Sequence, residues 1–258
     1  MEEAAMNIGD YLKRLNYLGP VHTGFETLKR LQTAHLQNIP FENLDIGLGR
    51  KIELNESALW NKLIIQKRGG FCYELNGLFA WLLIQIGYQV TYLNARDYHE
   101  EDDGFGIDFD HLALLVNATN ETASWLVDVG WGDTFTQPLN INDPSEQVQG
   151  LRGYWVEPFK DGYQVWQRNY DGTRERHYFF DLTPHRFPDE YLNTCLYHQT
   201  SPKSIFTQRG IISRLTENGR VSLDNEKLII TSNGNRITRE VKESERASLL
   251  KEYFGVTI

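Results

Sequence analysis

Apolar residues recur every three or four positions along the first 87 residues, a spacing typical of amphipathic helices. The pattern predicts three helices, each bounded by a polar cap, a proline or a glycine: 25–39, 55–69 and 72–87. Few strand signals interrupt this region. We therefore expect a helical bundle of three or four helices over residues 1–87.

From Tyr88 the apolar period changes to two, and aromatic and β-branched residues become frequent. The change predicts six strands: 88–95, 109–117, 124–130, 153–158, 162–168 and 174–181. Asp161-Gly162 and Asp171-Gly172 are typical hairpin turns between the last three. Residues 88–190 are therefore expected to form an antiparallel sheet or small barrel.

The C-terminal zone, residues 191–258, combines both patterns. A helix-like segment is followed by strands punctuated by Asn218-Gly219 and Asn233-Gly234, and then by a helix over 243–254. Together the three zones predict an α+β protein with a helical bundle, a β-barrel and an α/β lid.

Composition adds that the chain is globular. Of the 258 residues, 40% are hydrophobic and 24% charged, close to globular averages. The longest apolar run, 78–84, is too short to span a bilayer, and the acidic start lacks the apolar core of a secretory signal. We expect a cytoplasmic protein without a membrane partner.

The net charge of the chain indicates which classes of ligand it can bind. The net charge is 26 − 35 = −9, which disfavours a nucleic-acid binder that neutralises phosphates. Residues 192–258 nevertheless carry ten Lys or Arg against seven Asp or Glu, so this zone could hold a small anion. The acidic stretch 97–108 lacks the spacing of a calcium loop and is predicted to be a solvated loop, and no metal site is expected.

The two cysteines are expected to be free thiols, because they are too few for a disulfide framework and lack zinc-site spacing. Cys72 follows Gly69-Gly70 and opens a helix, where backbone N–H groups and the helix dipole favour a thiolate. The alternative is a small buried hydrophobic residue. Cys195 has no such surroundings and is expected to be structural.

A reactive cysteine needs a histidine held by a carboxylate. His111 opens one predicted strand and Asp128 closes the next. In an antiparallel hairpin, the residue numbers of directly opposed residues have a constant sum. If Asn117 opposes Thr122, this sum is 239, and His111 then lies opposite Asp128. The alternative is two polar residues on a solvated strand face, because a one-residue slip destroys the pairing.

At this point the chain resembles the arylamine N-acetyltransferases, specifically the bacterial ones. Four blocks carry the resemblance, in the family's order and spacing: Ile39-Pro40-Phe41-Glu42-Asn43-Leu44, Arg68-Gly69-Gly70-Phe71-Cys72-Tyr73-Glu74-Leu75-Asn76-Gly77, Asp110-His111-Leu112 and Asp128-Val129-Gly130-Trp131-Gly132. The similarity covers essentially the whole chain and weakens after Asp189. Trp131 is a departure, because the family more usually has phenylalanine there.

The resemblance implies transfer of an acetyl group from acetyl-CoA to arylamines or arylhydrazines through a Cys72 thioester, on a fold related to papain-like and transglutaminase enzymes. It implies that Cys72 is the nucleophile, His111 the base and Asp128 its orienting acid. The backbone N–H groups of Cys72 and Tyr73 would hold the oxyanion. Further positions are expected to contact the acceptor: Phe41, Phe71, Asp110 and Trp131. Gly130 and Gly132 are expected to let the backbone approach a ligand, taken as CoA, or to turn the chain away from Asp128, and Phe206 of the positively charged C-terminal zone is expected to pack near the cofactor.

Several of these residues have structural alternatives. Phe41 and its neighbours could simply end a helix, and Arg68, Glu74 and Asn76 could fix the cysteine loop by internal hydrogen bonds. Two other functions use the same residue types: a papain-like or transglutaminase-like enzyme acting on amides, and a non-catalytic binding module. Only acetyl transfer predicts that acetyl-CoA labels the protein with an acetyl group that an arylamine removes.

Overall fold

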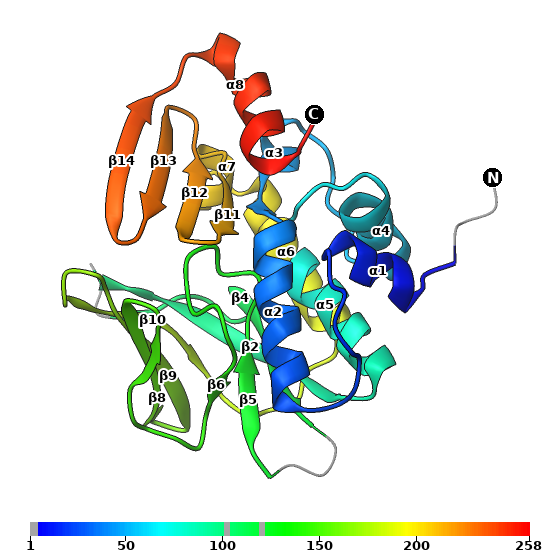
Figure 1. Ribbon diagram of the computed structural model, residues 1–258, viewed down its shortest axis with the longest axis vertical. Coiled ribbons are helices and arrows are strands. Elements are labelled where there is room, and N and C mark those ends of the chain that lie inside the picture. Colours follow the sequence, from blue (N-terminus) through cyan, green and yellow to red (C-terminus); the bar gives the residue numbers. More distant parts are fainter. Residues whose placement is uncertain (1–4, 101–103, 119–121) are drawn as a thin grey trace.

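Three regions follow one another along the chain, as the sequence predicts for an α+β protein (Figure 1). The computed structural model describes residues 5–100, 104–118 and 122–258. In Figure 1 the blue and cyan helices stand beside the green curled sheet, and the orange C-terminal sheet lies above that curled sheet. Among the described residues, no helix is long and apolar enough to cross a membrane.

The three predicted helices are present in the first region as α2 Phe25–Asn38, α4 Glu56–Trp60 with a π-helical turn over Asn61–Ile65, and α5 Cys72–Ile86. Two short helices, α1 Ile8–Arg14 and α3 Leu44–Gly47, were not predicted. Asn55 caps α4 by accepting the Ala58 N–H at 2.9 Å, and Gly87 ends α5 in the left-handed region at φ 109°. A two-residue strand that the sequence did not indicate, β1 Phe41–Glu42, lies between α2 and α3.

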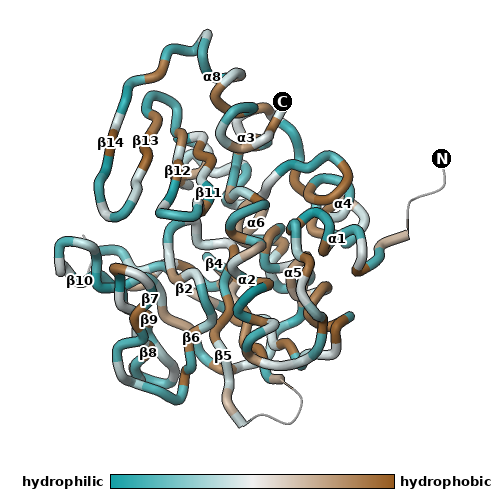
Figure 2. Tube along the Cα trace, in the orientation of Figure 1, coloured by the Kyte–Doolittle hydropathy of each residue, from teal (hydrophilic) through white to brown (hydrophobic). Residues whose placement is uncertain are grey.

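Helix α5 forms the centre of the molecule. Its apolar side chains are buried on nearly every face. Figure 2 shows hydrophobic, brown stretches along α5. The helix contacts α1 and α4 on one side and strands β2 and β4 on the other. Burying a leucine or phenylalanine contributes about 1.5–3 kcal/mol, so this packing fixes the residue at the helix start, Cys72, against the sheet.

The second region is one antiparallel sheet of β2 to β10. Its strands are β2 Gln89–His99, β3 Gly104–Phe105, β4 His111–Asn117, β5 Ser124–Val127, β6 Leu139–Asn140, β7 Gln147–Gln149, β8 Arg152–Phe159, β9 Gly162–Arg168 and β10 Arg174–Phe180. The order is β6-β5-β4-β2-β10-β9-β8-β7, with β3 beside β2. The two outer strands meet through Gln147, whose side chain bonds the backbone N–H and C=O of Asn140 at 2.9 and 3.0 Å. The barrel thus closes through a side chain and not through a strand ladder.

Three details of this region differ from the sequence-based expectations. The β4–β5 pairs sum to 241 and not 239, for example Leu114 with Val127, so Asp128 lies diagonally from His111. The turn after β8 is Lys160-Asp161, because Gly162 already pairs with Phe159. The stretch 97–108 is not entirely a loop, since β2 continues to His99 and β3 follows; its residues 101–103 lie outside the described residues.

The C-terminal region is a five-stranded antiparallel sheet packed against a helix. It comprises α6 Leu192–Thr200, α7 Ile205–Gln208, β11 Ile212–Thr216, β12 Gly219–Leu223, β13 Lys227–Ser232, β14 Asn235–Glu240 and α8 Glu243–Leu249, which continues as a π-helical turn to Phe254. The fifth strand is β1, which pairs with β11. The first and last thirds of the chain therefore share one sheet.

The glycine pair before Cys72 is required by close packing against β1. The Gly70 N–H donates to the Pro40 carbonyl at 3.3 Å, and the Glu42 N–H donates to the Gly70 carbonyl at 2.8 Å. A Cβ on Gly69 would lie 2.1 Å from the Pro40 oxygen, a backbone atom that cannot rotate away. The segment is thus held against β1 and is not a flexible hinge.

We expect Gly69→Ala to lower the free energy of unfolding by about 1–3 kcal/mol, because the added methyl group displaces the β1 backbone. The control is Gly47→Ala in α3, where nothing lies within 4 Å of an added Cβ and the substitution should be neutral or stabilising. Urea unfolding of both variants measures the difference. Equal stabilities would contradict the close-packing interpretation.

Candidate active site

Cys72 is the first residue of α5 and is 3% exposed. Its helix begins with a hydrogen bond from the Phe71 N–H to the Glu74 carboxylate at 3.1 Å. The N–H groups of Cys72 and Tyr73 fall in the first helical turn, whose N–H groups have no partner within a helix. Cys195, by contrast, is buried in α6, where the Gln199 side chain donates to its sulfur at 3.3 Å. Both cysteines are free thiols.

His111 and Asp128 form a buried pair beside Cys72. His111 Nε2 lies 2.7 Å from Asp128 Oδ2, and both side chains are almost fully buried. The pairing survives the register error because a shift of two residues leaves a strand's side chains on the same face. Gly130 then brings the barrel onto the cysteine, since a Cβ there would lie 2.6 Å from Cys72 Cα.

Asn76, one turn after Cys72 in α5, joins the helix to this pair. Its Nδ2 donates to the Leu112 carbonyl at 2.6 Å and to Asp128 Oδ1 at 2.9 Å, and its Oδ1 accepts the Val129 N–H at 2.9 Å. The sequence suggested that Asn76 fixes the cysteine loop. Its bonds instead connect the cysteine helix to both strands that carry His111 and Asp128.

Two aromatic residues complete the surroundings of the pair. The Tyr178 hydroxyl donates to Asp128 Oδ2 at 3.2 Å. The Trp131 ring lies edge-on to His111 at 5.0 Å and stacks on His177 at 5.3 Å. Sequence reasoning missed Tyr178, because an inward-facing tyrosine on a strand is indistinguishable from a core residue until the sheet order is known.

The environment shifts the pKa values of all three candidate catalytic residues. Burial disfavours the charged form of His111, but the neighbouring Asp128 outweighs this effect and raises the pKa of His111. Burial likewise disfavours the charged form of Asp128, but His111, Asn76 and the Gly130 N–H lower its pKa. Burial raises the pKa of the Cys72 thiol, an effect that the Leu112 backbone opposes. The low thiol pKa expected from the helix start therefore needs a further cause, and a protonated His111 would supply it.

Buried ion pairs hold the cysteine loop from behind. Arg68 binds Glu42 at 2.7 Å and Asp45 at 3.0 Å, and Lys62 binds Asp45 and Glu74, each at 2.8 Å. Burial raises the pKa of Glu74 to about 7, although Lys62 opposes the shift. Arg68 and Glu74 thus make the internal bonds that the sequence suggested.

The other side of the site is aromatic. The Phe206 ring, from α7, lies 5.8 Å from Phe71 and 6.4 Å from Phe41. Gly132, at φ 96°, places its backbone against Phe41. The structure thus brings together four residues predicted to contact ligands. Gly130, also predicted to contact CoA, packs against Cys72.

Asp110 lies at the edge of this group. Its Oδ1 is 3.1 Å from His198 Nε2 of α6, and its carbonyl accepts the Tyr73 hydroxyl at 3.1 Å. Sequence reasoning missed Asp97, which approaches the same site from β2. Within the described parts of the chain, no group of three or more His, Cys, Asp or Glu side chains is placed to hold a metal ion.

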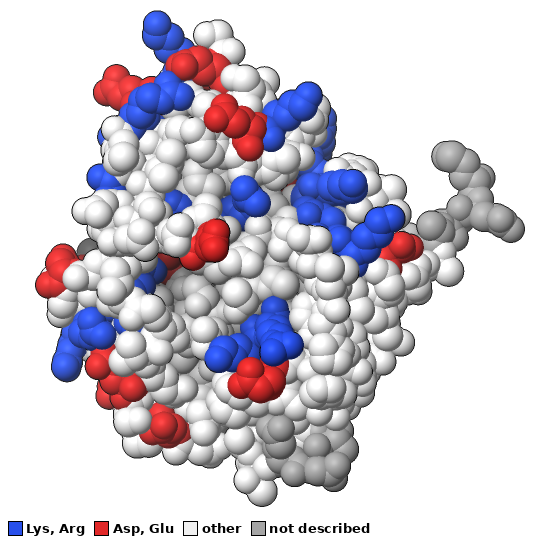
Figure 3. Space-filling model, viewed as in Figure 1, with Lys and Arg blue, Asp and Glu red and all other residues white. Residues whose placement is uncertain are grey.

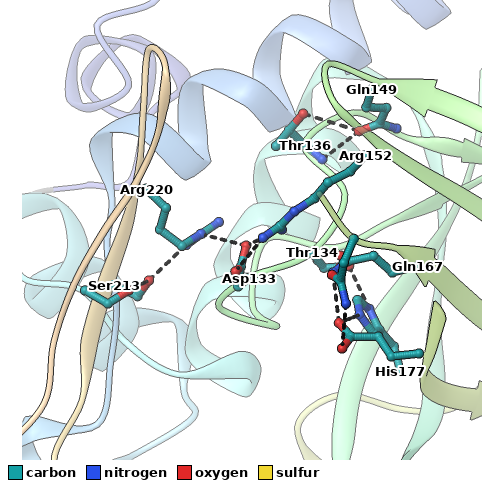
Figure 4. A network of polar contacts seen from close by, with 12 residues as sticks. Asp133, Thr134, Thr136, Gln149, Arg152, Gln167, His177, Ser213 and Arg220 are labelled. Atoms are coloured by element: carbon teal, nitrogen blue, oxygen red, sulfur yellow. Dashed lines mark hydrogen bonds and ion pairs between the residues drawn. The ribbon is translucent and has the colours of Figure 1, made fainter. Parts of the chain in front are cut away.

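A cleft of about 510 Å³ lies between the barrel and the C-terminal sheet, and three arginines, Arg152, Arg220 and Arg236, contribute to its lining. Figure 4 shows Asp133 between the guanidinium groups of Arg152 and Arg220, at 2.7 and 3.0 Å. Burial alone would raise the pKa of Asp133, but Arg220 and Arg152 lower it to about 2.

Surface charge on the face seen in Figure 3 is mixed, with acidic residues between the basic ones. The positive balance of residues 192–258 therefore forms no continuous basic surface on this face. The cleft between the barrel and the C-terminal sheet also carries basic side chains, those of Arg152, Arg220 and Arg236.

Comparison with known proteins agrees with this geometry. The N-acetyltransferase family model matches residues 24–258. The chain is 32% identical to the pineal gland isozyme NAT-3 of arylamine N-acetyltransferase from Gallus gallus, over 98% of this chain and 95% of that protein. It is also 32% identical to the proansamycin X synthase of Amycolatopsis mediterranei, over 93% and 94%.

Among solved structures, the arylamine N-acetyltransferase of Mycobacterium marinum in complex with CoA superimposes with a TM-score of 0.91 at 27% identity, covering 97% of this chain and 93% of that one. The resemblance expected from the four sequence blocks is thereby confirmed over the whole fold. The chain belongs to the arylamine N-acetyltransferase family.

Proposed function

We propose that this chain transfers an acetyl group from acetyl-CoA to the nitrogen of arylamines or arylhydrazines through a thioester on Cys72. The observation that carries the proposal is the buried His111–Asp128 contact of 2.7 Å, tied by Asn76 to the helix that begins at Cys72. A nucleophile, a base and an orienting carboxylate are the parts that acyl transfer requires.

In the first step the Cys72 sulfur attacks the carbonyl carbon of acetyl-CoA. The bond from that carbon to the CoA sulfur breaks, and CoA leaves as a thiol that takes its proton from His111. In the second step the amine nitrogen attacks the acetyl carbon, its proton passes to His111, and the Cys72 sulfur leaves. Because one thioester replaces another in the first step, the exchange is nearly isoenergetic and needs no metal.

His111 uses its two ring nitrogens for different tasks in this proposal. Nε2 is bonded to Asp128, so Nδ1 is the nitrogen that exchanges a proton with the sulfur. The backbone N–H groups of Cys72 and Tyr73 stabilise the oxyanion of each tetrahedral intermediate. One such donor is typically worth about 10² to 10³ in rate.

The acceptor ring would lie between Phe41 and Phe71 on one side and Trp131 on the other, with Asp110 at the edge. For CoA, the arginine-lined cleft is the best-supported route to Cys72. The cleft residue Gln167 donates to Glu175 at 2.8 Å. Glu175 in turn contacts His177 at 3.2 Å, and His177 stacks on Trp131, so this chain of contacts joins the cleft to the site. Gly132 and Phe206 would meet the acetyl end of the cofactor.

We expect mixing with acetyl-CoA to add one acetyl group to the wild type and none to Cys72→Ser, since the serine hydroxyl is a far weaker nucleophile. Intact-mass spectrometry measures the label, and an added arylamine should remove it. Cys195→Ala is the matched control and should be labelled like the wild type. Labelling of Cys72→Ser, or its absence in Cys195→Ala, would show that the acyl carrier is another residue.

We also expect the reactivity of Cys72 to depend on the charge of His111. Burial alone raises the pKa of the thiol, so without the imidazolium the thiolate forms only at more alkaline pH. The pH midpoint of iodoacetamide alkylation should therefore rise by about two units or more in His111→Asn. Asp128→Asn should also raise this midpoint. Loss of the Asp128 charge lowers the pKa of His111, so the imidazolium that stabilises the thiolate is lost at a lower pH.

The control for this measurement is His22→Asn, the same substitution at an exposed histidine. Its alkylation profile should coincide with that of the wild type. Identical profiles for wild type, His111→Asn and Asp128→Asn would mean that no charge is shared between this pair and the sulfur.

A further inference from the structure

Asp97 is a carboxylic acid on the inward face of the barrel. It continues the inward series of β2, in which Leu93 and Ala95 are fully buried in the barrel core. Ala95 pairs with His111 across β4, and Asp97 pairs with Tyr178 across β10. Because directly paired residues share a face with Cβ atoms about 5 Å apart, the Asp97 side chain lies beside the Tyr178–Asp128–His111 group.

The Asp97 carboxyl is costly to the fold. Its Oδ1 is buried and has no hydrogen-bond partner among the described residues. Burial and the nearby Asp110 raise the pKa of Asp97 to about 7, although His111 and His99 oppose this and Asp128 adds to it. A buried carboxyl oxygen without a hydrogen-bond partner destabilises a protein. Carboxyl groups with strongly shifted pKa values are concentrated at functional sites.

The proposed mechanism does not use the Asp97 carboxyl, and a negative charge on Asp97 is unfavourable to the Cys72 thiolate. Asp97 is among the groups that raise the pKa of the Cys72 thiol. Asp97 also raises the pKa of His111, so its charge favours the imidazolium while it opposes the thiolate, and it does not by itself promote the ion pair. The group that remains to benefit is the second reactant, an amine whose nitrogen becomes positive as it attacks the acetyl carbon.

Asp110 adds a second negative charge next to Asp97. Its Oδ1 lies 3.1 Å from His198 Nε2, and its Oδ2 packs closely on Gly106, where an added Cβ would lie 2.3 Å away. Tyr73, the residue after Cys72 in α5, donates a hydrogen bond from its hydroxyl to the Asp110 backbone carbonyl. Two acidic residues thus lie near Cys72: Asp97 is close enough to raise the pKa of its thiol, and Asp110 is bound through its carbonyl by the hydroxyl of Tyr73, the next residue in the chain.

We propose that Asp97, reinforced by Asp110, sets the charge preference of the acceptor pocket, favouring aromatic amines that carry a second positive or hydrogen-bond-donating group and rejecting those that carry a carboxylate. The inference rests on the acetyl transfer proposed above. A cationic substituent gains from the two carboxyl groups in a partly buried pocket, whereas an anionic one is repelled by them.

The test compares three acceptors of nearly the same shape: 4-aminobenzamidine, 4-aminobenzamide and 4-aminobenzoate, which are cationic, neutral and anionic. Wild type, Asp97→Asn and Asp108→Asn are first acetylated with acetyl-CoA at pH 8, where Asp97 is mostly ionised. The rate at which each acceptor removes the acetyl group is then measured by intact mass. Asp108 is the matched control, because its side chain is 67% exposed and removing its charge alters only the surface.

We expect the wild type to react with the benzoate about tenfold more slowly than with the benzamide, and with the benzamidine faster than with either. Intrinsic reactivity runs the other way, because the carboxylate withdraws least electron density from the amine. Asp97→Asn should bring the benzoate rate to within about threefold of the benzamide rate, and Asp108→Asn should keep the wild-type order.

Equal rates in the wild type for the three acceptors would overturn the inference, whether or not Asp97→Asn folds. An unchanged order in a folded Asp97→Asn would overturn it as well. Failure of acetyl-CoA to label the wild type is a separate result, seen before any acceptor is added. It would remove the proposed function and this inference with it.

Discussion

The three hydrogen bonds of the Asn76 carboxamide are the constraint on which the site depends. They connect the helix that begins at Cys72 to Leu112 of β4 and to Asp128 and Val129 beyond β5, each within 2.9 Å. The absence of a side chain at Gly130 lets the same segment contact Cys72 Cα. Because these groups are buried, any loosening of the helix would leave several polar atoms unsatisfied, which costs about 1–3 kcal/mol for each.

Around that junction the protein separates rigid support from selectivity. Ion pairs among Glu42, Asp45, Lys62, Arg68 and Glu74 hold the cysteine loop from behind, and the loop itself is packed against β1. These charges are paired with one another. The acceptor side of the proposed function is built differently, from the aromatic rings of Phe41, Phe71 and Trp131 together with Asp97, whose buried Oδ1 has no hydrogen-bond partner among the described residues. A change there can alter which amine reacts without disturbing the nucleophile.

Much of the architecture could be predicted from periodicity. The helices over α2, α4 and α5, the long strands of the barrel and the glycine-marked turns of the last sheet were predicted within a few residues, because each depends on local spacing and turn chemistry. The hairpin register was wrong by two residues. His111 and Asp128 still meet, because an even shift preserves the face of a strand and a diagonal neighbour is within reach of these side chains.

The sequence by itself determined the family and the identity of the candidate cysteine, histidine and aspartate, because those depend on short motifs that are contiguous in the chain, and it determined the α+β class, because that depends on local hydrophobic periodicity. Only the tertiary structure decided how they are held and what lies beside them. The pairing of β1 with β11, the bond from Tyr178 to Asp128 and the approach of Asp97 join residues far apart in the sequence. Their positions follow from strand order and from which face each strand buries, and both are settled by packing of the whole barrel rather than by local pattern.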